Sequence, residues 1–157
     1  MRSVLAIPML LSLAFMATAA DFKSAQAQLE ATHPGLKWKA SLVGDFNCDS
    51  IADQAYAAQS REHFYVAVAL SPESNAPKLS VLRLQLKGNS QDSLCGQPPF
   101  PLELESMDYD PTQAIGSLPS GFRQSATCSG IRLIPGECDS FHIYWSFESN
   151  ELDWWRL

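Results

Sequence analysis

The sequence is poor in the side chains and motifs that mark common enzymes. It has only three histidines, His33, His63 and His142, and it contains no G-x-S-x-G elbow, no H-E-x-x-H helix and no phosphate-binding loop. Ser140, His142 and Asp139 are close in sequence, but neighbours on one strand point to opposite faces and cannot form a triad. These absences predict that the protein is not an enzyme.

One catalytic alternative concerns a dense set of acidic residues, Glu103, Glu105, Asp108 and Asp110. Paired carboxylates of this kind carry out glycoside hydrolysis. A solvated acidic edge is the simpler interpretation, and it makes the same four residues our candidate contact surface for a partner protein.

Basic residues are also scarce. Lys and Arg number 11 against 17 Asp and Glu, which gives a formal net charge of −6. Without Arg2, which lies in an apolar N-terminal segment, 10 basic residues face 17 acidic ones and the charge is −7. This charge argues against nucleic acid, whose phosphates would repel the protein. It favours a basic partner through electrostatic steering, or it serves solubility alone.

Long hydrophobic runs are missing after residue 20. The first 20 residues combine Arg2, an apolar run over residues 4–16 and the small residues Ala17, Thr18 and Ala19, and this pattern predicts a signal peptide cleaved after Ala20. A membrane anchor is the alternative, but the run is shorter than the ~20 residues that a span needs. We therefore expect a periplasmic or secreted protein with one domain over residues 21–157 and no membrane span after cleavage.

Four cysteines remain in this domain, Cys48, Cys95, Cys128 and Cys138. An even number in an exported chain predicts two disulfides, for which three pairings are possible. The short sequence separation favours Cys128–Cys138, which leaves Cys48–Cys95 as the long-range bond. A zinc site is the alternative, although no Cys-x-x-Cys spacing is present.

The hydrophobic periodicity predicts a small, mostly β, antiparallel domain that begins with one helix. Phe22, Ala25 and Leu29 recur at helical spacing and predict a helix over residues 21–32. Period-two alternation predicts strands within residues 36–42, 53–59, 63–70 and 78–88. In the first of these, the alternation places Leu36, Trp38, Ala40 and Leu42 on one face.

The C-terminal half has a less regular pattern. Residues 95–121 contain five prolines and predict extended segments and loops, with Leu102 and Leu104 in an edge strand. Residues 140–147 and 152–157 predict a β-hairpin. Aromatic side chains alternate onto both of its faces, so the hairpin is either buried on both sides or exposes an aromatic face.

The stretch "GDFNCDSIAD" (residues 44–53) predicts a cation-binding loop. Asp45, Asn47, Asp49 and Asp53 occupy positions one, three, five and nine of this loop, and the carbonyl of Ile51 falls at position seven. Calcium prefers six to eight oxygen ligands in a tight loop, and alternate positions of such a loop point inward. We therefore expect one calcium ion.

The segment "LVGDFNCDSIADQAYAAQ" resembles a single FG-GAP/VCBS-type repeat, the calcium-loop hairpin of integrin-like propellers. The resemblance implies that Asp45, Asn47, Asp49 and Asp53 supply side-chain ligands and Ile51 a carbonyl ligand. Position six of such loops is glycine and position four often is, whereas this chain has Ser50 and Cys48. The alternative is a disulfide-pinned hairpin in which the Asp and Asn residues only form turns. A single loop cannot build a propeller, which needs several repeats of ~40 residues.

The C-terminal segment, with its "ECD-x-x-H-x-YW…WWR" pattern, resembles the ends of small exported bacterial proteins. Some of these are similar to periplasmic immunity proteins of a lysozyme-inhibitor-like β fold, encoded beside cell-wall-degrading effectors. The resemblance implies an exported inhibitor or immunity protein that binds a basic cell-wall hydrolase. A calcium-stabilised structural or adhesive module without inhibitory activity is the alternative, and core packing is the simpler role for the aromatic residues Tyr144, Trp145, Trp154 and Trp155.

Overall fold

The computed structural model describes residues 19–71 and 77–157, with side chains from residue 22 onward. Most of the predicted signal peptide, residues 1–18, lies outside the described residues. The described part begins with helix α1 (Ala19–Thr32), which confirms the predicted N-terminal helix. No helix in these two ranges is long and apolar enough to span a membrane.

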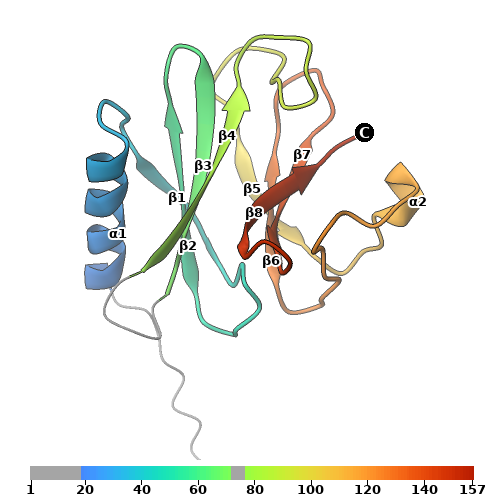
Figure 1. The fold of residues 1–157 in the computed structure, drawn as a ribbon, viewed down its shortest axis with the longest axis horizontal. Helices are drawn as coiled ribbons and strands as arrows, with labels where there is room; N and C mark the ends of the chain where they lie inside the picture. Colours follow the sequence, from blue (N-terminus) through green and yellow to red (C-terminus); the bar gives the residue numbers. More distant parts are fainter. Residues whose placement is uncertain (1–18, 72–76) are drawn as a thin grey trace, which may run out of the picture.

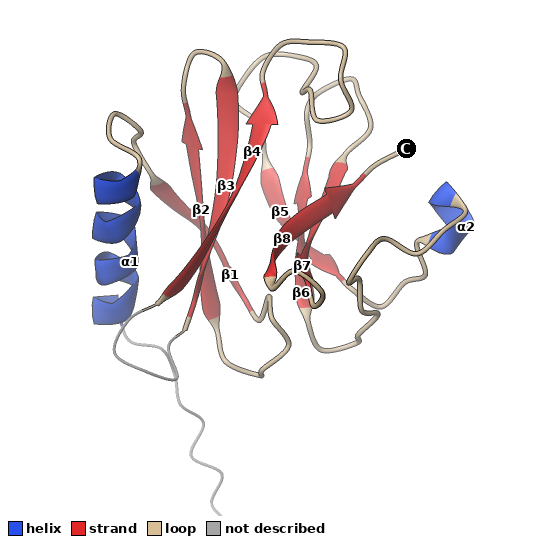
Figure 2. Ribbon diagram, in the orientation of Figure 1, coloured by secondary structure: helices blue, strands red, loops and turns tan. Residues whose placement is uncertain are grey.

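Two four-stranded antiparallel sheets form the body of the protein (Figures 1 and 2). The first sheet has the order β1-β2-β3-β4, with β1 (Lys39–Gly44), β2 (Asp53–Gln59), β3 (His63–Leu70) and β4 (Lys78–Gln85). The second has the order β5-β6-β7-β8, with β5 (Leu102–Ser106), β6 (Ser129–Leu133), β7 (Phe141–Ser146) and β8 (Glu151–Trp155). The mostly β fold and the edge position of the strand containing Leu102 and Leu104 are therefore confirmed.

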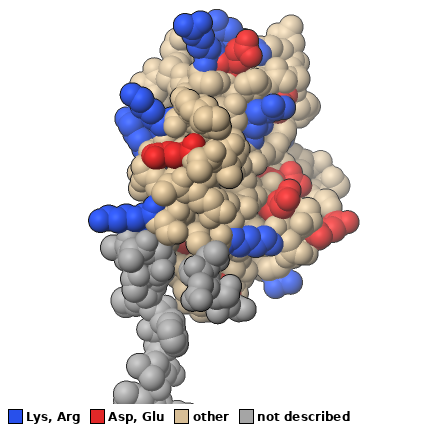
Figure 3. All heavy atoms as spheres, turned by 60° about the vertical axis from the view of Figure 1, so that its left-hand side comes forward, with Lys and Arg blue, Asp and Glu red and all other residues tan. Residues whose placement is uncertain are grey.

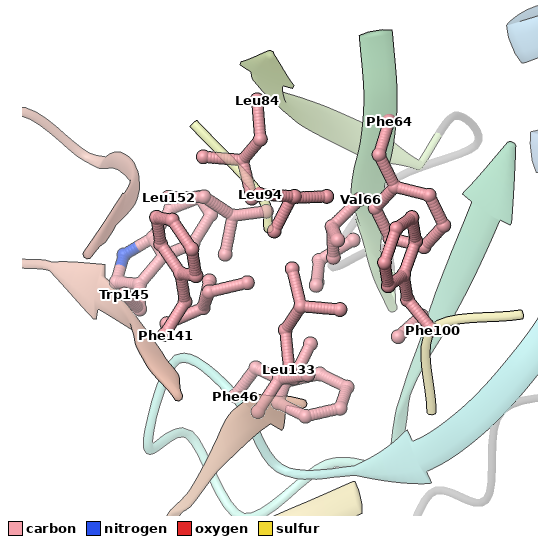
Figure 4. Close-up of a cluster of buried hydrophobic side chains, with 14 of the residues drawn as sticks. Phe46, Phe64, Val66, Leu84, Leu94, Phe100, Leu133, Phe141, Trp145 and Leu152 are labelled. Carbon is pink, nitrogen blue, oxygen red and sulfur yellow. The ribbon is translucent and has the colours of Figure 1, made fainter. Parts of the chain in front are cut away.

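The two sheets face each other across the main hydrophobic core. Figure 4 shows side chains from both sheets in it, among them Val66 and Leu84 from the first sheet and Leu133 and Phe141 from the second. Each of these four is 0% exposed. This packing follows from the alternation along the strands, because every second side chain points to the same face.

Helix α1 covers the outer face of the first sheet (Figure 1). Its buried residues Ala25 and Leu29 pack with Trp38 and Tyr56, and the Tyr56 hydroxyl donates a hydrogen bond to the carbonyl of Phe22 at 2.7 Å. Small side chains on β2 and β3, such as Ala67, let the helix approach the sheet closely. The helix and the first sheet thus form a second layer of packing behind the main core.

The predicted common face for Leu36, Trp38, Ala40 and Leu42 is wrong. The pairing of β1 with β2 shifts register between Ala40 and Leu42, which indicates a β-bulge. A bulge inserts one unpaired residue, so the side chains after it point to the opposite face from the one that simple alternation predicts. Trp38 therefore packs beneath α1, whereas Leu42 packs against the core between the sheets.

The outer face of the second sheet is covered by the segment that contains the short helix α2 (Thr112–Ile115). Met107 and Phe122 from this segment pack on Tyr144 and Trp155, and the Tyr144 hydroxyl donates to the Ser120 carbonyl at 2.9 Å. The C-terminal hairpin is consequently buried on both sides, which is the first of the two alternatives that its aromatic residues allowed.

Both disulfides form, but the predicted pairing is wrong. The bonds are Cys48–Cys128 and Cys95–Cys138, with Cα–Cα distances of 5.1 and 5.9 Å. Cys128 directly precedes β6 and Cys138 follows it, so the two cysteines lie toward opposite ends of a strand whose residues rise about 3.3 Å each. The favoured local pair could not meet because β6, which the sequence pattern did not reveal, separates its two members.

Candidate functional site

The β1–β2 loop keeps the backbone shape of a tight ligand loop although it lacks the expected glycines. Cys48 and Ser50, at positions four and six, have φ values of 63° and 67°. These values lie in the left-handed region, which glycine occupies without strain and other L-residues occupy at a cost. The two positions at which the resembling calcium loops carry glycine are therefore the two positions, Cys48 and Ser50, that have left-handed backbone here.

The side-chain oxygens at positions one, three and five point at backbone N–H groups of the same loop. The Asp45 carboxylate accepts hydrogen bonds from the N–H groups of Asp49 at 3.1 Å and Ser50 at 2.9 Å. Asp49 accepts from the N–H of Ile51 at 2.8 Å, and Asn47 accepts from the N–H of Asp49 at 3.2 Å. These bonds fold the loop into a compact turn with its oxygen-bearing side chains gathered together.

Asp53, at position nine, is fully buried and joins two loops. One carboxylate oxygen accepts from the N–H of Phe46 at 2.9 Å and the other from the N–H of Ser71 at 2.8 Å. The pKa of Asp53 is raised from 3.8 to about 6: burial is the main cause, the two N–H donors oppose it, and the nearby Asp49 and Asp45 carboxylates add to it.

The sign of this effect on stability follows from proton linkage. Because the folded protein holds the Asp53 proton more tightly than the unfolded chain does, deprotonation of this group lowers the free energy of unfolding as pH rises from about 4 to 6. Above that range the carboxylate is a buried negative charge that only N–H dipoles, or a cation, can offset.

The donor set fits calcium in chemical type. Three carboxylates, the Asn47 amide and the Ile51 carbonyl are hard oxygen ligands, and the two left-handed residues give the loop the required curvature. The same oxygens serve backbone N–H groups, and in the described part of the chain no three His, Cys, Asp or Glu side chains are arranged to hold a metal ion. Ion binding would therefore require Asp45 and Asp49 to share or exchange their N–H partners.

The loop is tied to the second sheet at two adjacent points. The Cys48–Cys128 disulfide joins position four of the loop to the residue before β6, and the N–H of Ser129 donates to the Asp45 carbonyl at 2.8 Å. Removing loop-closure freedom from the unfolded chain is the way such long-range disulfides stabilise proteins. The candidate ligand loop is thus held at the edge where the two sheets meet.

The four acidic residues predicted as a contact surface do not form one free loop. Glu103 and Glu105 lie on β5, where Glu103 forms an ion pair with Arg132. Asp110 accepts hydrogen bonds from the backbone and side chain of Thr112 at the start of α2, and Asp108 accepts from Gln124 at 3.2 Å. In the described part of the chain the Asp108 carboxylate thus has this exposed hydrogen bond and no ion pair.

Glu105 belongs to a cluster that sequence reasoning missed. Its carboxylate lies 2.8 Å from Nδ1 of His142, and the His142 ring stacks on Trp155 with ring centroids 4.0 Å apart. Burial, followed by the nearby Glu105 carboxylate, raises the pKa of the adjacent Tyr109 to about 12. His142 and Trp155 pair directly in the β7–β8 hairpin, but β5, which carries Glu105, reaches them only through β6, so the spacing in sequence gave no signal for the Glu105–His142 contact.

The acidic residues are concentrated in the second half of the sequence. Residues 95–157 contain nine acidic and three basic residues, a charge of −6, whereas residues 21–94 contain eight acidic and seven basic residues, a charge of −1. Figure 3, which turns the α1 side forward, shows Lys and Arg side chains spread over that side together with Asp and Glu. The net negative charge therefore lies mainly on the second sheet and its loops.

Comparison of the chain with protein-family models, with curated proteins and with solved structures finds no significant match in any of the three. The function therefore has to be inferred from the residues themselves.

The left-handed backbone at Ser50 generates a stability prediction. Replacing Ser50 with glycine should raise the free energy of unfolding by roughly 0.5–1 kcal/mol, because relief of left-handed strain exceeds the added freedom of the unfolded chain. Urea unfolding followed by tryptophan fluorescence measures the change.

Ser149→Gly provides the matched control, since Ser149 is an exposed turn residue without positive φ. The Ser149→Gly substitution should leave the free energy of unfolding unchanged or lower it slightly. A Ser50→Gly protein that is no more stable than the unmodified protein would contradict the role assigned to the loop backbone.

Proposed function

We propose that the protein is an exported, calcium-stabilised binding protein that inhibits a basic cell-wall hydrolase in the bacterial envelope. The observation that carries the proposal is the concentration of acidic charge on the half of the molecule that contains the second sheet. The two disulfides support an oxidising compartment. The N-terminal signal-like segment supports export.

Acidic side chains at the rim of such an interface would act mainly on the rate of association. Opposite charges steer two proteins toward productive encounter, and salt screens the gain over a Debye length of about 8–10 Å. Asp108 and Glu151 suit this role because both are exposed on the second half and neither has a cationic partner within the described residues. Glu103 and Glu105 already face Arg132 and His142, so their charge is partly offset.

Calcium would complete the loop that joins the two sheets. Its charge would offset the buried Asp53 carboxylate together with Asp45 and Asp49, which lie close enough to raise its pKa. The favouring observation is the pair of left-handed residues at positions four and six, the positions at which calcium loops carry glycine. A calcium-stabilised structural or adhesive module that inhibits no enzyme rests on the same loop and is the second candidate function.

Calcium should raise the melting temperature, because an ion that binds only the folded state stabilises it by RT ln(1 + [L]/Kd), about 2.7 kcal/mol at a hundredfold excess over Kd. Scanning calorimetry in calcium and in chelator measures the shift. Asp49→Ala should abolish the shift, whereas Asp108→Ala, which changes the same charge outside the loop, should preserve it. Equal melting temperatures in calcium and in chelator would contradict calcium binding by the folded protein.

Inhibition is tested with a candidate basic cell-wall hydrolase, for which any hydrolase encoded by a neighbouring gene is the first choice, in a cell-wall lysis assay together with a measurement of association kinetics. The Asp108→Asn/Glu151→Gln protein should associate several-fold more slowly at low salt with an unchanged melting temperature, because steering weakens while the fold is untouched. The matched control, Glu30→Gln/Glu62→Gln, removes the same charge from exposed positions on the side of the first sheet and should leave association nearly unchanged.

Two results would count against the inhibitor. Equal slowing by both double variants would show that net charge, and not the acidic half, guides binding. Absence of binding and inhibition at micromolar concentration would leave the calcium-stabilised module as the function.

A further inference from the structure

A groove of about 500 Å³ opens on the side of the molecule where the edge strand β1 approaches the segment that leads into β5. Its inner wall includes Phe64 from β3 and Phe100, whose rings meet edge-to-face with centroids 5.5 Å apart. Figure 4 shows these two rings side by side at the margin of the core. The groove is thus an opening beside the hydrophobic layer between the sheets, at a volume typical of small-molecule sites.

Two lysines, Lys37 and Lys39, also line this groove. Lys39 pairs in register with Ala57, which packs against the core, so Lys39 is set on the core-facing side of the first sheet. Lys37 joins it as a lining residue, and both are exposed. A positive side chain on the core-facing side of an edge strand protects the edge from pairing. Two lysines that line the same groove as Phe64 and Phe100 also create a place for an anion.

Among the described residues, the groove is lined by positive side chains and by no negative ones. None of its lining residues is acidic, and neither lysine forms an ion pair with any other residue in the described ranges. The protein as a whole is acidic, so this pair of lysines without acidic neighbours in the described lining gives the groove a local charge of the opposite sign, which favours an anionic ligand. An apolar wall with a few convergent polar groups is the usual composition of a ligand site.

We infer that this groove binds a small amphipathic carboxylate. The apolar part of the ligand lies against Phe64 and Phe100, and the carboxylate meets the ammonium groups of Lys37 and Lys39. The inference is independent of the proposed inhibition, since the groove contains none of the acidic residues assigned to the hydrolase.

Decanoate below its micelle concentration is the probe, and amide chemical shifts of the isotope-labelled protein report where and how tightly it binds. Shifts should concentrate on residues 37–41, residues 57–59, Phe100 and Leu102. Decanol, which has the same chain without the charge, should bind several-fold more weakly. Raising the salt concentration should weaken decanoate binding and leave decanol binding unchanged, a comparison that needs no mutation.

Lys37→Gln/Lys39→Gln should weaken decanoate binding roughly three- to tenfold, as expected for two exposed charge contacts. The control Lys23→Gln/Lys87→Gln removes two exposed lysines that do not line the groove and should leave the affinity unchanged. Melting temperatures identify any variant that fails to fold. Decanol binding as tightly as decanoate, equal weakening by both double variants, or shifts centred outside the groove would overturn the inference.

Discussion

The buried Asp53 carboxylate is the interaction on which the region around the candidate site depends. It begins β2, and its two oxygens hold the N–H groups of Phe46 in the β1–β2 loop and Ser71 at the end of β3. A buried N–H group without a partner costs about 1–3 kcal/mol, and this one side chain is the acceptor for two such groups. Phe46 is thereby fixed as part of the main core.

The same loop also connects the two sheets. Asp53 accepts a hydrogen bond from the N–H of Phe46 within the loop. The Cys48–Cys128 disulfide joins the loop to the residue before β6, and the N–H of Ser129 adds a hydrogen bond to the Asp45 carbonyl. On the opposite edge, the N–H of Leu152 donates to the Ser80 hydroxyl at 2.8 Å and links β8 to β4. The sandwich is therefore held at both margins, and a calcium ion would reinforce only the margin formed by the loop.

Prediction from the sequence succeeded where one local rule decided the outcome. Residues 63–70 form a continuous run rich in aromatic and β-branched side chains and make up β3, and Phe22, Ala25 and Leu29 mark α1. Prediction failed where distant contacts decide. In β6, Gly130 weakens the strand pattern, yet a Cβ atom there would lie 2.6 Å from the Met107 sulfur and 3.0 Å from the Ile143 backbone carbonyl oxygen, so close packing favours the glycine. With β6 unseen, the cysteine pairing and the Glu105–His142–Trp155 cluster could not be derived, while the loop's ligand-type residues were found because their spacing is local.

The stability of the protein with Asp53 replaced by alanine tests the anchoring role most directly. Urea unfolding at pH 7 in the presence of a chelator should give a loss of about 2–4 kcal/mol, because the Phe46 and Ser71 N–H groups lose their acceptors together. Asp108→Ala, an exposed carboxylate outside the loop, should change the free energy of unfolding by less than about 0.5 kcal/mol. If Asp53→Ala lowered the free energy of unfolding by no more than the Asp108→Ala control does, the anchoring role of Asp53 would be contradicted.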